Sequence, residues 1–400
     1  MRENLIQGLR CGALAWCLVF GAGVPAWAQS AAATPAVDPA FATLGRMVAA
    51  INSDPGLQSL YRQWFERQSE ALRTQARSLA AQGGARNLLV AATLNDLPER
   101  SSWFDAAATT PSAQSRQWRE AALSVRPRDR LASWVEAIHC GTNAGGCDRT
   151  AAIMFLLQSE PDNAAVHLLA LDEAGRRGDG AAMRQYLRMA GQATRYDTHA
   201  QEWLQLMERT IRSSANATLD PALALAIERT TGSSAATVAD GAGATFLTHL
   251  VMTTVLTPPL DWLMSICSAH DLDEQGRDDC IRTMDLLAHD GKTVVEQFSG
   301  TIGLVRLSIT DADSRAWRDW LRQISWINER AGQLIPVSMI DNPMSYGAFL
   351  RWIVEQGEFA AYSELMARSG VDMSPPGEWL PNNPRQRALI TSGSDEGFSR

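Results

Sequence analysis

The chain has 400 residues, of which 46% are hydrophobic and 20% are charged, and its net charge at neutral pH is −8. This composition is ordinary for a globular protein, and it excludes wholesale disorder, a collagen-like fibre and a polytopic membrane protein. The negative charge also argues against a nucleic-acid binder driven by bulk charge. At about 150 residues per domain, the length predicts two to three domains.

Residues 1–28 have the pattern of a secretory signal peptide: two arginines, an uncharged apolar run over 11–24, and small residues ending at Ala28. We expect cleavage after Ala28, which leaves a short linker over 29–37. The apolar run is shorter than the roughly 20 residues of a membrane-spanning helix. The sequence therefore predicts a periplasmic or secreted protein with no stable membrane span after cleavage.

Two alternatives to a cleaved signal are an N-terminal membrane anchor and a lipoprotein. Residues 14–17 end in Cys17 like a lipoprotein signal, but the bulky Trp16 stands where that motif has a small residue. We therefore favour the cleaved signal peptide.

Apolar residues recur at helical spacing along most of the chain, whereas strand-like alternation is scarce. Aspartate followed by proline, a pair that favours helix starts, occurs at Asp38, Asp54 and Asp220. The pattern predicts amphipathic helices over 55–82, 129–139, 197–212 and 313–331, and a buried core helix over 242–257. We expect an all-α protein, built either as an array of helix pairs or as an irregular helical bundle.

The segment 161–190 is predicted to form two helices joined by a turn at Gly178-Asp179. It opens with Pro161-Asp162-Asn163, and Leu187 and Ala190 stand where the second helix packs on the first. This order resembles a single degenerate tetratricopeptide unit of about thirty residues. His167 replaces the large aromatic residue of that family, and no proline closes the unit near Arg195. The resemblance implies helix pairs stacked into a curved array that binds a protein or peptide.

A small, polar, uncharged stretch over 213–218 is the expected boundary between two helical regions. We assign the N-terminal, tetratricopeptide-like region to 38–214 and the C-terminal helical region to 219–370. Residues 371–400 are rich in proline, glycine and polar side chains, and this composition predicts an extended or disordered tail. Trp379 within the tail is expected to dock on the body of the protein.

Four cysteines remain after the signal is removed, namely Cys140, Cys147, Cys267 and Cys280. An even number in an exported chain predicts disulfides, and three connectivities are open. The pairing that is local in sequence, Cys140–Cys147 with Cys267–Cys280, is the simplest. A metal site that adds His139 and His270 is the alternative, but the cysteine spacings match no zinc pattern.

Two loops have part of a ligand-binding motif. Gly291-Lys292-Thr293 is similar to the end of a phosphate-binding loop, but Leu286 stands where that loop needs a glycine. Asp271 and Asp273 have the spacing of a calcium loop. Its twelfth position, however, is an arginine instead of a bidentate carboxylate. We expect the acidic residues of the second loop to stabilise a helix that starts near Asp278.

The sequence predicts no catalytic residue, no cofactor and no metal site. Six histidines are scattered along it, and the short motifs of serine hydrolases, zinc peptidases and β-lactamases are not found. The tryptophans of 313–331 are expected to pack in a core. We predict a non-enzymatic, exported helical scaffold that binds a protein or peptide. The alternatives are a cell-envelope enzyme whose site assembles from distant residues, and a helical protein that binds a small molecule or lipid.

Overall fold

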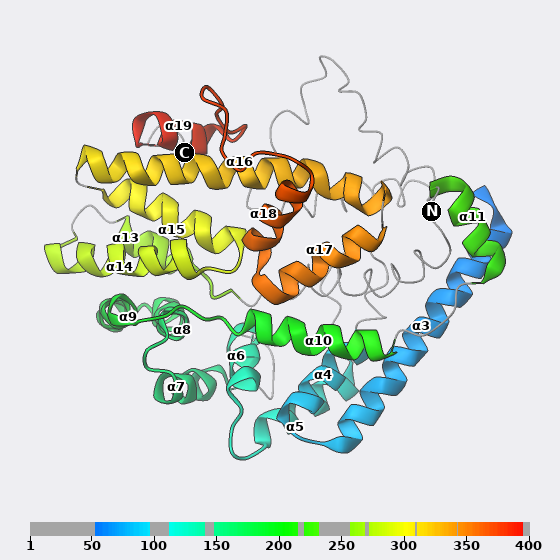
Figure 1. Ribbon diagram of the computed structural model, residues 1–400. Coiled ribbons are helices and arrows are strands. Elements are labelled where there is room, and N and C mark those ends of the chain that lie inside the picture. Colours follow the sequence, from blue (N-terminus) through cyan, green and yellow to red (C-terminus); the bar gives the residue numbers. More distant parts are fainter. Residues whose placement is uncertain are drawn as a thin grey trace. The chain divides into compact units, whose positions relative to one another are not determined.

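The computed structural model describes residues 53–96, 112–140, 148–214, 220–231, 257–268, 272–308, 310–341 and 343–394. Within these ranges the chain is helical and contains no strand, which confirms the predicted all-α class (Figure 1). The predicted signal peptide, the linker over 29–37 and the predicted core helix over 242–257 lie outside the described residues. So does most of the expected boundary at 213–218.

The chain divides into two compact units that are interleaved in sequence. Unit 1 takes Met1–Val125, Leu204–Val255 and Ala331–Glu355, and unit 2 takes Arg126–Trp203, Leu256–Arg330 and Gln356–Arg400. The divisions after Trp203 and after Arg330 fall inside two helices, α10 (Ala200–Ser214) and α16 (Asp311–Asp341).

Among the described residues, unit 1 contains the remainder of α10 and α16 together with five further helices. These are α3 (Pro55–Gln82), α4 (Ala85–Asp96), α5 (Ala113–Ser124), α11 (Pro221–Thr231) and α17 (Pro343–Gln356). Helix α3 has the predicted bounds because the Asp54 side chain accepts hydrogen bonds from the first amides and Gly83 ends the helix with a positive φ. Helices α3, α4 and α5 pack in sequence order.

The described part of unit 2 contains nine helices besides the first parts of α10 and α16. These are α6 (Arg130–His139), α7 (Arg149–Ser159), α8 (Ala164–Arg176), α9 (Gly180–Gln192), α13 (Asp261–Cys267), α14 (Glu274–Asp290), α15 (Val294–Leu307), α18 (Glu358–Arg368) and α19 (Pro384–Ser392). Helices α8 and α9 form the expected pair with its turn at Gly178, and α9 also packs on α14.

Helices α14 and α15 lie side by side at a very close approach (Figure 1). A Cβ atom added at Gly300 would lie 2.5 Å from the Met284 carbonyl oxygen and 2.5 Å from the Ala288 nitrogen. Because these are backbone atoms of α14, the contact depends on glycine at this position. By contrast, Gly332 on α16 has nothing within 4 Å of an added Cβ.

The aromatic stripe of α16 packs in a core, as predicted. Leu321 and Ile324 are buried together with Val305 of α15 and Leu389 of α19, and Trp317 packs against them. This stripe is therefore a packing surface.

The tail differs from the prediction, because residues 384–392 form helix α19 and are not extended. Asn383 accepts hydrogen bonds from the amides of Arg385 and Gln386, proline occupies the first helical position, and Leu389 is buried. Trp379 docks as expected: its ring lies edge-on to Trp326 with centroids 5.1 Å apart. A composition rich in proline and polar residues thus concealed a short, well-capped helix.

Candidate functional site

The predicted disulfide between Cys267 and Cys280 is present and ties α13 to α14. Cys140 is buried at the C-terminal cap of α6. Its predicted partner, Cys147, lies outside the described residues, so that pairing stays a prediction. Within the described ranges, no group of three or more His, Cys, Asp or Glu side chains is arranged to hold a metal ion.

The two loops with partial ligand motifs serve as helix caps. Thr293 caps α15 and forms a capping box with Glu296. Asp273 accepts a hydrogen bond from the Gly276 amide and caps α14. Helix α14 therefore begins at Glu274, and the expected start near Asp278 was wrong because the cap lies further upstream. Asp271 lies outside the described residues.

The four histidines that the structure describes do not converge. His139 is exposed in the last turn of α6, and His249 and His270 lie outside the described residues. His167 is buried, with Nε2 2.8 Å from the Pro161 carbonyl oxygen, and burial lowers its pKa. His289 is exposed on α14. Of the described histidines, only His199 lies in a cluster of charged groups.

That cluster surrounds Glu160, whose carboxylate is 1% exposed at the end of α7. Arg195 Nη2 donates to Glu160 Oε2 at 2.8 Å, and Asn163 Nδ2 donates to the same oxygen at 2.9 Å. His199 Nε2 lies 2.9 Å from Glu160 Oε1, and its other nitrogen lies 3.3 Å from Glu202 Oε2. Every polar atom of the Glu160 carboxylate therefore has a partner.

The shifted pKa values in this cluster follow from these contacts. Burial alone would raise the pKa of Glu160, but the hydrogen bonds from His199, Asn163 and Arg195 outweigh it and lower the pKa to about 2. Burial alone would lower the pKa of His199, and the carboxylate of Glu160 raises it instead. Each group holds the other in its charged form.

The cluster has a structural role, because it fastens the segment after α9 to the start of α8. The Ala164 amide donates to the Arg195 carbonyl at 2.8 Å, and the Asp197 amide donates to Asn163 Oδ1 at 3.0 Å. The segment 161–190 has no closing proline near Arg195, and the ion pairs of Arg195 hold its end in place instead. The contacts occupy both carboxylate oxygens of Glu160 and both ring nitrogens of His199.

The carboxyl groups of Glu296 and Glu358 join the N-termini of α15 and α18. Glu296 accepts hydrogen bonds from the Lys292 and Thr293 amides and from the Tyr196 hydroxyl, each at 2.9 Å. Glu358 accepts from the Val294 amide at 2.8 Å. These bonds tie the two helix ends together.

The same pair has unusual acidity. Burial raises the pKa of Glu296. Burial also raises the pKa of Glu358 to about 7, against the lowering effect of hydrogen bonds from Val294 and Tyr362. The Glu296 charge adds to the increase at Glu358. Glu358 thus changes its charge near neutral pH inside a helix–helix junction.

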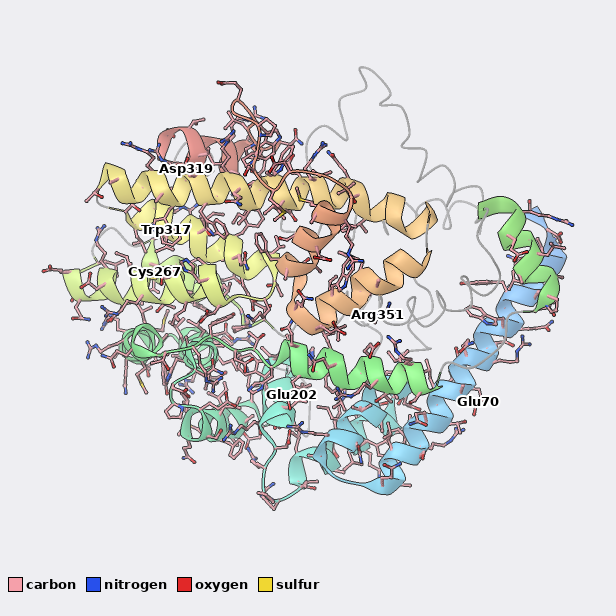
Figure 2. All side chains as sticks on the ribbon, viewed as in Figure 1. Glu70, Glu202, Cys267, Trp317, Asp319 and Arg351 are labelled. Carbon is pink, nitrogen blue, oxygen red and sulfur yellow. A yellow bond between two sulfur atoms is a disulfide. The ribbon has the colours of Figure 1, made fainter. Side chains whose placement is uncertain are left out.

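A half-open groove of about 330 Å³ lies between α10 and α17 in unit 1. Its first wall carries Gln205, Glu208 and Arg209, and its second wall carries Arg351, Val354 and Glu355. Each set has the spacing i, i+3, i+4 that puts three side chains on one face of a helix. Figure 2 shows Arg351 on the side of α17 that is turned toward α10.

Val354 is the one apolar residue among the six that line the groove, and the other five are polar or charged. Val354 is 2% exposed, and its carbonyl oxygen accepts a hydrogen bond from Gln205 Nε2 at 3.4 Å. Glu208 forms an ion pair with Arg212 of its own helix. The side chains of Arg209, Arg351 and Glu355 make no hydrogen bond or ion pair with any other residue that the structure describes.

In this groove, charged side chains of described residues therefore lie close together without forming ion pairs with one another. Sequence reasoning missed it, because Gln205, Glu208 and Arg209 occupy the polar face of a predicted amphipathic helix, where charges are usually solvated. The start of α17 had a usable signal, since Asn342-Pro343 repeats the pair found at Asn383-Pro384.

None of the described helices is long and apolar enough to cross a bilayer. No family model, curated protein or solved structure matches this chain.

Proposed function

We propose that this protein is an exported, non-enzymatic helical scaffold that binds a segment of a protein or peptide in the groove between α10 and α17. The observation that carries the proposal is the set of charged side chains that face the groove from both helices without partners among the described residues. Protein interfaces combine an apolar core with a polar rim, and the buried Val354 is the apolar residue of this groove.

The other polar clusters support this choice by contrast. The Glu160 cluster and the Glu296–Glu358 pair are tied up in hydrogen bonds that hold helices together. A catalytic acid or base needs an open position for substrate. The resemblance of residues 161–190 to a tetratricopeptide unit also favours binding of a protein or peptide.

Site-directed photo-crosslinking tests the binding role. A photoreactive amino acid replaces Glu355 at the groove or, as the control, Arg188, which is exposed on α9 and has no described partner. In the source cells we expect a discrete adduct at position 355 that mass spectrometry maps to one protein segment, and no such adduct at position 188. Identical adducts at both positions, or none at position 355, would contradict the proposal.

Export is tested independently by fractionation and intact-mass analysis. We expect the protein in the envelope or secreted fraction with Gln29 as its first residue, because the apolar run ends in small residues at Ala28. A chain that keeps residues 1–28 and stays in the cytoplasmic fraction would rule out export.

A further inference from the structure

We infer that the segment bound in this groove is acidic, and that Arg209 and Arg351 bind its carboxylate groups from opposite walls. This inference rests on the proposed function and specifies the partner of the same groove. It follows from the charges of the groove and from its size.

Neither acidic side chain of the groove forms an ion pair with Arg209 or Arg351. Glu208 is already paired with Arg212, and Glu355 makes no ion pair with either Arg209 or Arg351. A guanidinium group has a planar fork of donors that matches a carboxylate with two parallel hydrogen bonds. Two such forks on opposite walls of the groove favour a carboxylate over a neutral side chain.

The volume of the groove and the charge of Glu355 further limit which segments can bind. A space of about 330 Å³ accepts a few side chains of an extended segment but not a folded domain. Glu355 on the rim repels a run of many acidic residues. We therefore expect one or two carboxylates flanked by uncharged residues.

The net charge of the chain indicates which charges can attract an acidic segment. The chain carries a net charge of −8, so its long-range field does not attract an acidic partner. The attraction must come from the groove itself. Neutralising the two groove arginines should then abolish most of the binding, whereas neutralising two arginines elsewhere should not.

The experiment uses the full-length protein and three arrays of short peptides of about nine residues. The central two positions are Asp or Glu in the first array, Asn or Gln in the second, and Lys or Arg in the third. The flanking positions are varied among uncharged residues. Peptides bound from the arrays are then measured in solution by fluorescence anisotropy.

We expect selective binding of the acidic array and at least about tenfold weaker binding by R209Q/R351Q, a loss of 1.4 kcal/mol or more. The matched control R184Q/R188Q removes two exposed arginines one turn apart on α9, and it should bind like the unchanged protein. Glu355→Gln should bind acidic peptides more tightly. The thermal midpoint of R209Q/R351Q should be unchanged, because neither arginine has a described intramolecular partner.

Three outcomes would overturn the inference while leaving the proposed function intact. These are equal binding of the Asn/Gln array, binding of acidic peptides that is insensitive to R209Q/R351Q, and preference for the Lys/Arg array. Binding of free glutamate or inorganic phosphate as tightly as the best peptide would replace the peptide by a small anion. Absence of binding to every array, together with no groove adduct in crosslinking, would overturn both proposals.

Discussion

Replacing Glu160 by glutamine is the most informative perturbation of the buried charge cluster. The substitution keeps the size of the side chain but removes its charge. It also points an amide NH₂ group at donors of Arg195, Asn163 or His199, which now contact the two carboxylate oxygens. If the amide faces Arg195 and Asn163, donors oppose donors; if it faces His199, the imidazole must be neutral so that its Nε2 accepts the hydrogen bond. Either arrangement loses the ion pairs of the carboxylate.

The magnitude follows from the acidity of Glu160. Its pKa falls from an ordinary value of 4.5 to about 2 in the folded protein. Since one pKa unit corresponds to about 1.4 kcal/mol, the charged form stabilises the folded state by about 3 kcal/mol. The side chain is 1% exposed, so solvent screening does not reduce this figure much.

The pH window has two limits. A carboxyl group with a lowered pKa contributes stability that is present above pH 4.5 and lost as the pH falls through about 2. The pKa of His199 is raised, so its contribution is present below the ordinary value of 6.5 and lost as the pH rises through the higher folded value. The difference between the original protein and Glu160→Gln should therefore be largest between about pH 5 and 6.

Urea unfolding followed by circular dichroism, repeated across this pH range, measures that difference. The control is Glu364→Gln, which breaks an exposed ion pair with Arg368 on α18 and should cost less than about 0.5 kcal/mol at every pH. A loss at Glu160→Gln no larger than in the control, or a loss that does not shrink toward pH 2, would refute the assigned role of the cluster.

Three further predictions concern packing, acidity and the disulfide. Gly300→Ala should lower the unfolding free energy by about 1–3 kcal/mol because of the clash with α14, whereas Gly332→Ala should raise it by up to about 1 kcal/mol; equal stabilities would contradict the close approach. Tyr362→Phe removes a hydrogen bond to Glu358 and should therefore raise the pKa of that carboxyl group above about 7. A carbon-13 NMR titration measures this pKa, and an unchanged or lower value would argue against the contact. Cys267→Ser should cost about 2–3 kcal/mol under oxidising conditions and little under reducing conditions, as judged by urea unfolding.

The features that the sequence predicted well are those encoded within a few residues. The bounds of α3 follow from Asp54-Pro55 at one end and Gly83 at the other, because capping and positive φ act locally. The Cys267–Cys280 bond spans 13 positions and joins neighbouring helices. The prediction for the tail was wrong for a related reason. The composition of about thirty residues predicts an extended segment, but the local cap at Asn383-Pro384 starts a helix.

The groove and the buried clusters depend on pairs that local patterns do not encode. Gln205 meets Val354 across 149 positions, and Tyr196 meets Glu296 across 100. On either helix of the groove alone, an arginine beside a glutamate looks like an ordinary solvated face. It becomes a candidate binding surface only because Glu208 is paired within α10 and no ion pair joins the charged side chains of the two walls. Charged groups that have no partner within the tertiary structure are therefore the candidates for binding. The peptide arrays measure whether a carboxylate of another molecule binds the two groove arginines.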